Sequence, residues 1–252
     1  MKPLRRHTLP RQGGFSILEM MISVLILTIV MGALFGVLDV GQRRMAAEQT
    51  KLDDFQEVRD FGDQFFRDIN QIGDPNVRLF DLSGGTWSPA LQSPVINDSR
   101  FAIGLVKIDA NQIQFEASVN GISTVQSITY MINGSGTCTL CLQRSQVTKV
   151  NGSPLTAQTQ NWGTEVNDVQ SNPIFKYYDT TGTQITTLPV DISTTAGANT
   201  IATVKTIQIN LRVSNPEIKD LQTGGSIEGT FEGEVSLNNC SMASTGQAMS
   251  CQ

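Results

Sequence analysis

The chain has 252 residues, enough for one good-sized domain and an extended helix but few for two full domains. Its 18 basic and 23 acidic residues give a formal net charge of −5. This acidic balance argues against nucleic-acid binding, which needs basic surface to neutralise phosphates.

The first 14 residues, MKPLRRHTLPRQGG, are polar and carry four basic residues and no acidic one. Without them the chain keeps 14 basic and 23 acidic residues, a net charge of −9. A secretory signal places its small-residue cleavage site after an apolar stretch, whereas here the apolar stretch begins only at Phe15. A cut at Gly14 would therefore leave the apolar stretch in the product.

Residues 20–38 contain no charged residue, and only Ser23 and Thr28 carry polar side chains. A helix of this length covers ~29 Å, about the thickness of the hydrocarbon core of a bilayer. A buried core helix is the alternative, but such long uninterrupted runs favour a membrane span. Basic residues precede the run, which favours a cytoplasmic amino terminus and an exported remainder.

Glu19 is the fifth residue of the apolar segment when the segment is counted from Phe15, and an isolated carboxylate there is costly and usually has a partner. The segment holds no Lys or Arg, so the nearest cation in a cut chain is the new α-amino group at Phe15. An ion pair from Glu19 to the amine of a neighbouring subunit would fix the axial stagger between two helices. The alternative is a carboxyl group that snorkels to the interface or is protonated.

The sequence GGFSILEMMISVLIL, residues 13–27, resembles the class A type IV prepilin signature. The resemblance implies that a prepilin peptidase cuts after Gly14 on the cytoplasmic side and methylates the amine of Phe15. It also implies that Glu19 guides subunit alignment. The implied partners are that peptidase, other pilins or pseudopilins bound through the amino-terminal helix, and an inner-membrane assembly platform. The leader of 14 residues is somewhat long for this class.

The helical pattern continues beyond the membrane run, because apolar residues recur at steps of three and four residues along one face. These residues are Leu52, Phe55, Val58, Gly62, Phe65, Ile69 and Ile72. No proline occurs between Pro10 and Pro75, and Gly73 followed by Asp74 and Pro75 is a stop signal. We therefore predict a helix from Phe15 to Ile72, 58 residues and ~87 Å long.

From residue 74 the sequence alternates turn residues with short β-type segments, which predicts an antiparallel sheet packed on the helix and an α+β fold. The clearest strand is 204–213, where apolar and polar residues alternate. Other predicted strands are 101–107, 112–119, 124–132, 139–148, 173–179 and 229–237. Residues 151–172 and 180–200 are predicted to be long surface loops. The predicted domains are a leader (1–14), a transmembrane or fibre-core half-helix (15–38), an amphipathic half-helix (39–73) and an exported β-rich head (74–252).

Three further patterns are similar to minor pilins of the PilW type and to J-class pseudopilins of type II secretion. They are the residues FFRDI at 65–69, the strand pair ITYMIN and LCLQRS, and the pair IQINLRV and EGEVSLNN near the carboxyl end. This resemblance, with the length of the chain, favours a low-copy subunit that primes a fibre or lies at its tip.

Cys138, Cys141, Cys240 and Cys251 all fall in the exported portion, where an even count favours disulfides. Positions three apart on one extended strand point to opposite faces, so either the chain turns between Cys138 and Cys141 or each pairs elsewhere. Of three connectivities we favour 138–141 with 240–251. The second resembles the carboxy-terminal disulfide region of many pilins, and such a loop stabilises by ~3 kcal/mol on the chain-entropy estimate. A redox CxxC should open a helix, and a four-cysteine zinc site wants two close pairs, so neither fits well.

The chain has one histidine, His7 in the leader, so the mature chain lacks Ser-His-Asp and Cys-His arrangements and His-ligated metals. No phosphate-binding or dinucleotide fingerprint occurs. The Asn167-Asp168 and Asn97-Asp98 pairs fit solvated turns better than calcium sites. We predict no enzyme activity, no cofactor and no resident metal.

The prediction is a structural minor pilin. Before assembly it would be a single-pass protein of the bacterial inner membrane with a periplasmic carboxyl terminus, and afterwards part of a pilus. The nearest alternative is a J-like pseudopilin of type II secretion, and a DNA-uptake pilus is a third destination. An alternative from another class is a signal-anchored periplasmic domain that never polymerises. It explains the membrane span, but neither Glu19 nor a cleavage site that comes before the apolar stretch.

Overall fold

The computed structural model describes residues 14, 16–73, 99, 102–119, 124–133, 140–152, 155, 160–219 and 225–237. The chain divides into two compact units, residues 1–48 and residues 49–252. Some of the residues singled out above lie outside the described residues: all but the last residue of the leader, Phe15, Asp74, Pro75, Asn97, Asp98, Cys138, Cys240 and Cys251.

Helix α1 runs from Ile17 to Ile69, 53 residues, within two or three residues of the predicted bounds. It begins where the carbonyl of Ser16 accepts hydrogen bonds from the amides of Glu19 and Met20, at 3.0 and 3.1 Å. After Ile69 two turn residues follow, and Gly73 adopts a left-handed φ of 76°. The amide of Gly73 donates to the carbonyl of Glu116 in the larger sheet, so the residue that ends the helix also contacts that sheet.

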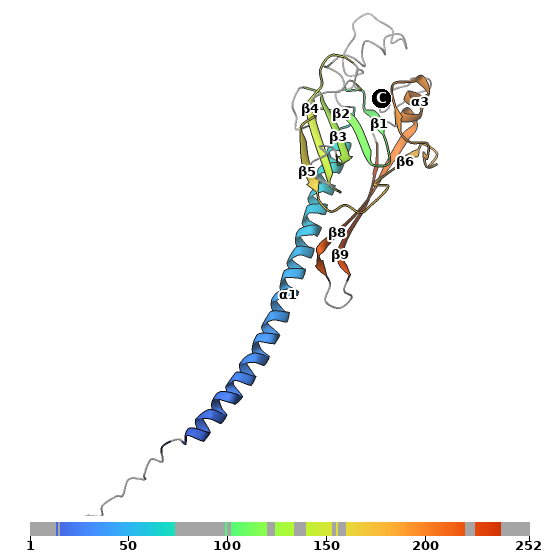
Figure 1. Ribbon diagram of the computed structural model, residues 1–252. Helices are drawn as coiled ribbons and strands as arrows, with labels where there is room; N and C mark the ends of the chain where they lie inside the picture. Colours follow the sequence, from blue (N-terminus) through green and yellow to red (C-terminus); the bar gives the residue numbers. More distant parts are fainter. Residues whose placement is uncertain are drawn as a thin grey trace, which may run out of the picture. The chain divides into compact units, whose positions relative to one another are not determined.

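The larger sheet has six antiparallel strands in the order β5-β4-β3-β2-β1-β7, and β1 to β5 are labelled in Figure 1. They are β1 (Leu105–Ile108), β2 (Gln112–Ala117), β3 (Gln126–Ile132), β4 (Leu142–Thr148), β5 (Trp162–Val166) and β7 (Val190–Asp191). Strands β1 to β5 follow one another as a meander, each paired with the next.

The smaller sheet has the order β6-β8-β9 and is also antiparallel. Its strands are β6 (Phe175–Asp179), β8 (Val204–Lys219) and β9 (Ser226–Ser236). Strands β8 and β9 form the long hairpin seen in Figure 1. Helix α3 (Thr195–Thr203) leads directly into β8.

The carboxy-terminal part of α1 packs on both sheets. The ring of Phe65 lies 5.3 Å from that of Tyr130 in β3 and 5.7 Å from that of Phe175 in β6. Phe231 of β9 lies over Gly62, where an added Cβ would approach its ring to 2.5 Å. The absence of a side chain at this position is therefore what lets the smaller sheet approach the helix. This arrangement confirms the predicted α+β fold.

Two predicted loops were wrong. Residues 151–172 contain β5, and residues 180–200 contain β7 and the start of α3. Strand β5 reads WGTEV and lies at the edge of its sheet, so it has little of the apolar alternation that marks a strand. Helix α3 reads TAGANTIAT with one buried residue, Ile201, which leaves no helical period to detect.

The predicted apolar stripe on α1 is confirmed at and beyond Val58 but not before it. Val58, Phe65 and Ile69 are at most 3% exposed. Leu52 and Phe55 remain 61% and 41% exposed. The predicted strands all occur, with ends that differ from the predictions by up to six residues.

Candidate functional site

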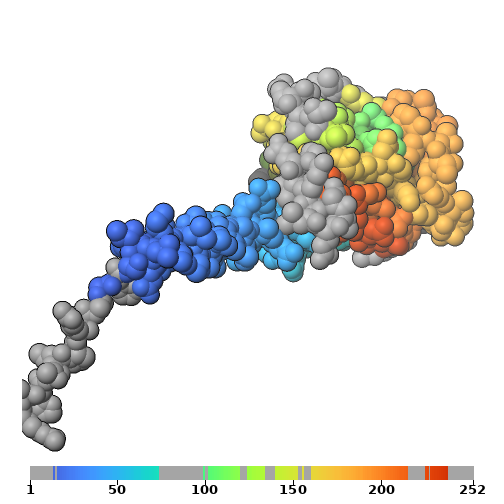
Figure 2. All heavy atoms as spheres, turned by 60° about the horizontal axis from the view of Figure 1, so that its bottom comes forward, coloured from blue at the N-terminus to red at the C-terminus, as the bar shows by residue number. Residues whose placement is uncertain are grey.

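The apolar part of α1 is uncovered in its unit. The large apolar side chains from Ile17 to Val40 are between 47% and 81% exposed. Figure 2 shows the side chains of this segment, in blue, on the surface of the unit. Among the described residues, α1 is the one helix long and apolar enough to cross a membrane, and none of its most apolar stretch is buried. This arrangement fits a membrane anchor.

Both hydroxyl groups of the apolar run are satisfied within the helix. Ser23 Oγ donates to the carbonyl of Glu19 and Thr28 Oγ1 to that of Val24, each at 2.8 Å. A hydroxyl bonded one turn back needs no partner from lipid. The two polar residues therefore do not oppose an apolar environment.

Glu19 lies in the first turn of α1. A carboxylate there interacts favourably with the partial positive charge of the helix amino terminus. Within the described part of the chain, Glu19 forms no ion pair. This interaction with the helix terminus is a local reason for an acidic residue at position 19, besides the predicted pairing with a neighbouring subunit.

Gly14 lies just before the helix, and the space that a Cβ would occupy there has no neighbour within 4 Å. The described atoms therefore leave this side of Gly14 open. Phe15, the other half of the predicted cleavage junction, lies outside the described residues. Cleavage and methylation at this junction remain predictions.

A buried polar cluster holds the end of α1 to the larger sheet. Asp68 Oδ2 accepts hydrogen bonds from Tyr130 Oη at 2.8 Å and from Arg144 Nε at 2.8 Å, and it lies 2.7 Å from Arg144 Nη2. The Asp68 side chain is only 2% exposed. Burial raises the pKa of Tyr130 well above its usual value, so its hydroxyl stays protonated and donates. Beyond the FFRDI resemblance, no sequence pattern predicts this cluster, because Tyr130 and Arg144 lie 62 and 76 residues after Asp68.

A second buried ion pair lies within the larger sheet. Lys149 Nζ is 2.7 Å from Glu116 Oε2, and both side chains are fully buried. The amide of Ile103 also donates to Oε2, at 3.1 Å. Burial raises the pKa of Glu116. The ion pair links β2 to the residue that follows β4, across β3.

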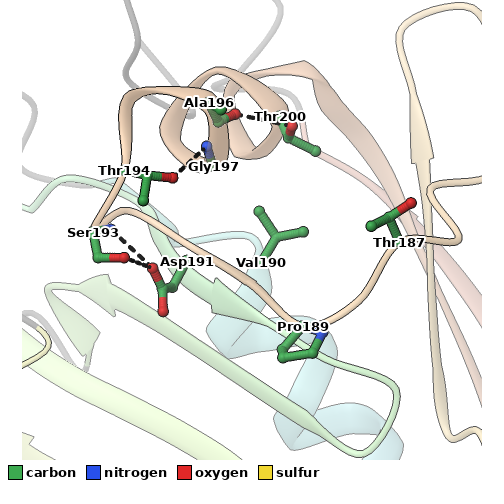
Figure 3. A pocket seen from close by; sticks show the side chains of 9 residues that line it. All are labelled: Thr187, Pro189, Val190, Asp191, Ser193, Thr194, Ala196, Gly197 and Thr200. Atoms are coloured by element: carbon green, nitrogen blue, oxygen red, sulfur yellow. Dashed lines mark hydrogen bonds between the residues drawn. The ribbon is translucent and has the colours of Figure 1, made fainter.

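A shallow pocket of about 350 Å³ lies beside the amino terminus of α3 (Figure 3). Its polar groups bond one another: Asp191 accepts from Ser193 Oγ, and Thr194 Oγ1 accepts from the amide of Gly197 at 3.0 Å. These hydrogen bonds from Ser193 lower the pKa of Asp191. The pocket contains no predicted site residue, and no set of free polar groups there points to a ligand class.

The described cysteine, Cys141, is disulfide-bonded and directly precedes β4. Leu140 before it has a left-handed φ of 61°. The connectivity itself stays a prediction. At the Asn167-Asp168 pair, Asn167 donates to Glu57 and the carbonyl of Asp168 accepts from Ser214. Within the described part of the chain, no group of three or more His, Cys, Asp or Glu residues is arranged to hold a metal.

A comparison with protein families identifies one match: residues 9–35 fit a family model described as the prokaryotic N-terminal methylation motif. No curated protein matches the chain. The matched residues include Gly14, Phe15 and Glu19 and most of the apolar run, and they end before the head. The motif supports a type IV pilin-like prepilin or pseudopilin, a class of structural proteins.

Proposed function

We propose that this chain is a structural minor pilin that is incorporated into a type IV pilus or primes its assembly. A prepilin peptidase cuts between Gly14 and Phe15 and methylates the new amine of Phe15. The observation that supports this best is the methylation motif at residues 9–35, which leads directly into an uncovered apolar helix.

In this proposal the chain is a single-span protein of the bacterial inner membrane before it assembles. Its amino terminus is cytoplasmic and its head periplasmic, as the basic leader favours. Residues 1–14 are the leader, residues 15–38 span the bilayer, residues 39–73 continue the helix, and residues 74–252 form the exported head. Cys138 pairs with Cys141, and Cys240 with Cys251.

During assembly, lateral contacts between residues 15–38 of neighbouring pilins replace contacts with lipid. Glu19 pairs with the methylated amine of Phe15 on the adjacent subunit and sets the register. An apolar surrounding makes this pairing strong, because neither charge has water to stabilise it. The partners are other pilins, the peptidase and an inner-membrane assembly platform.

The test is the substitution Glu19→Ala in the full chain, expressed with its assembly machinery. We expect cleavage to persist and the amount recovered in sheared fibres to fall at least about tenfold, the equivalent of roughly 1.4 kcal/mol. Glu48→Ala, which removes an exposed carboxylate farther along α1, serves as the matched control. If Glu19→Ala incorporates as well as the control, the chain is better explained as an anchored domain that does not polymerise.

A second candidate is a J-like pseudopilin of type II secretion, because the FFRDI and strand patterns resemble both groups. Both proposals include leader cleavage, methylation of the new amine and a register set by Glu19. They differ in the fibre that the chain joins. Deleting the gene and measuring surface pili and enzyme secretion in the same strain separates them. Loss of secretion with normal pili favours the pseudopilin. The net charge of −9 does not favour direct DNA contact in a DNA-uptake pilus.

A further inference from the structure

Strand β9 is an edge strand that pairs with β8 on one side, in a continuous register from Ile227 to Ser236. The amide of Leu237 continues this ladder and donates to the carbonyl of Lys205 at 2.8 Å. Hydrogen-bonded and non-bonded pairs alternate along an antiparallel ladder, so the odd-numbered residues of β9 form the bonded pairs. The backbone groups of the even-numbered residues therefore point away from β8. These residues are Glu228, Thr230, Glu232, Glu234 and Ser236.

The hydrogen bonds on the far side of β8 agree with this assignment. The amide of Asn210 donates to the carbonyl of Ile174 at 2.8 Å, and the amide of Gln170 donates to the carbonyl of Arg212 at 2.7 Å. Even-numbered residues of β8 thus bond away from β9. Among the described contacts, the outward amides and carbonyls of β9 from residue 228 to residue 236 have no hydrogen-bond partner.

The other sheet edges in the described part of the chain are closed or short. At the opposite edge of the smaller sheet, the amide of Phe175 donates to the carbonyl of Ala110, and the amide of Ile185 donates to that of Tyr177. In the larger sheet, β7 has two residues, and β5 has five with a register shift in its pairing. Proteins usually blunt an open edge with a short strand, a bulge or a proline. Strand β9 has 11 residues and no proline, so its backbone can accept a further strand.

The inner face of β9 lies on α1. Phe231 packs over Gly62, and Phe66 packs against Gly233. Phe55, which lies beside Gly229, remains 41% exposed. Successive side chains of a strand point to opposite faces, so every second side chain of an added strand would point to this apolar side.

The outer face of β9 is acidic. All five even-numbered side chains are exposed there, and three of them are glutamates. Glu228 forms an ion pair with Arg212, and Glu232 accepts a hydrogen bond from Asn210 Nδ2 at 3.1 Å. Glu234 has no hydrogen bond or ion pair among the described contacts. Pairing of β9 with the β9 of a second copy would bring two rows of glutamates together, and like charges directly opposite are destabilising.

We propose that the open edge of β9 is a pairing site for an extended segment of another protein. The segment adds as an antiparallel strand, with Lys or Arg on the outer face opposite the glutamates and apolar residues on the face toward α1. Backbone hydrogen bonds supply affinity in this kind of recognition, and the alternating side chains supply specificity. The site acts on the folded head alone, whether or not the chain assembles into a fibre.

The test uses synthetic eight-residue peptides and the full chain in micelles of an uncharged detergent, with binding measured by fluorescence anisotropy. A peptide of alternating Lys and Val should bind, and one of alternating Glu and Val should bind at least about tenfold more weakly. In the proposed pairing the lysine amides face β9 and the valine amides face solvent. N-methylation of the lysine amides should therefore weaken binding at least about tenfold, whereas N-methylation of the valine amides should change it less than about twofold.

Equal affinity of the two N-methylated peptides would overturn the proposal, because binding would then rest on charge alone. No binding of the Lys/Val peptide would overturn it too. Hydrogen–deuterium exchange with this peptide bound should fall in residues 228–236, and protection elsewhere without protection there would contradict the site.

Variants of the chain test the edge itself. Thr230→Pro removes one outward amide, and a proline is tolerated at an edge position whose amide faces away from the sheet. It should weaken the Lys/Val peptide by about tenfold, whereas the control Thr230→Val, which keeps the amide, should bind as wild type does. Unchanged affinity of Thr230→Pro would contradict the proposal. The peptide series needs no variant, so it tests the site independently of how Thr230→Pro folds.

A second variant tests the chemistry of the partner. Glu234→Gln should weaken the Lys/Val peptide by roughly threefold and reduce the dependence of binding on salt. Glu48→Gln, which removes an exposed carboxylate of α1 and changes the net charge equally, is the matched control. Equal affinities of the two variants would contradict a basic partner opposite β9.

Discussion

Large apolar side chains are exposed in residues 17–48, whereas most of those in residues 49–237 are buried. Leu25 in the first region is 61% exposed, whereas Leu211 in the second is fully buried. The second region supplies its own core from the end of α1, Ile201 of α3 and two sheets, while the large apolar side chains of the first are exposed. At about 25 cal/mol per Å² such a surface is costly in water, so the first region requires lipid or other apolar helices around it.

If this contrast is right, damage to the head should leave the anchor intact. Arg144→Met removes the cation beside buried Asp68 and should lower the free energy of unfolding of the head by about 3–5 kcal/mol. Membrane association should not change. Urea denaturation and membrane fractionation of the same variant measure the two effects.

The matched control for this variant is Arg212→Met. Arg212 pairs with Glu228 through side chains that are 51% and 45% exposed. Loss of such an exposed pair should cost much less than loss of the buried one, because water and salt screen the attraction between the two charges. Equal costs for the two variants would contradict a structural role for the Asp68 cluster.

The converse variant damages the anchor and leaves the head intact. Leu27→Lys puts a charge in the middle of the apolar run and should cost about 2.5–3.5 kcal/mol in membrane insertion. Insertion is measured by carbonate extraction and the head by its urea transition. Leu52→Lys, on the same helix but beyond the run, is the control. Equal extraction of both variants would argue against a membrane span at residues 17–38.

A smaller effect, with a defined dependence on pH, is expected inside the head. Lys149→Met leaves buried Glu116 without its cation and should cost about 2 kcal/mol near neutral pH. Burial already raises the pKa of Glu116, and loss of the lysine raises it further. A carboxyl whose folded pKa is raised contributes stability at low pH that is lost as the pH rises through that value.

The Lys149→Met variant should therefore regain stability relative to wild type when the pH is lowered from about 7 to about 5. Urea transitions at both pH values measure this change. Lys205→Met, which removes a partly buried lysine bonded only to a backbone carbonyl among its described contacts, is the control. A cost that is the same at both pH values would show that Glu116 does not titrate as described.

Local patterns predicted much of this molecule. The absence of proline and the stop at Gly73 predicted α1, and alternation predicted the core of β8. What was missed depends on partners far away in the chain. Strand β5 is defined by its pairing with β4, and Asp68 is buried because Tyr130 and Arg144 satisfy its carboxylate.

The functional residues also divide into those that the sequence alone predicts and those that only the structure brings together. Gly14, Phe15 and Glu19 lie within six consecutive residues, so their spacing could be recognised from sequence alone. The contact between Asn167 and Glu57 could not be recognised in this way, since the two residues are 110 positions apart. From its neighbours in the chain Asn167 was predicted to lie in a solvated turn, whereas its side chain donates a hydrogen bond to Glu57 of α1.

The most direct test of the central claim is the amino terminus of the mature protein. Intact mass and amino-terminal sequencing are applied to the chain recovered from membranes, with and without a co-expressed prepilin peptidase. We predict a chain that starts at N-methylated Phe15 only when the peptidase is present. A chain that still starts at Met1 with the peptidase present, or that starts beyond residue 38, would contradict the prepilin account.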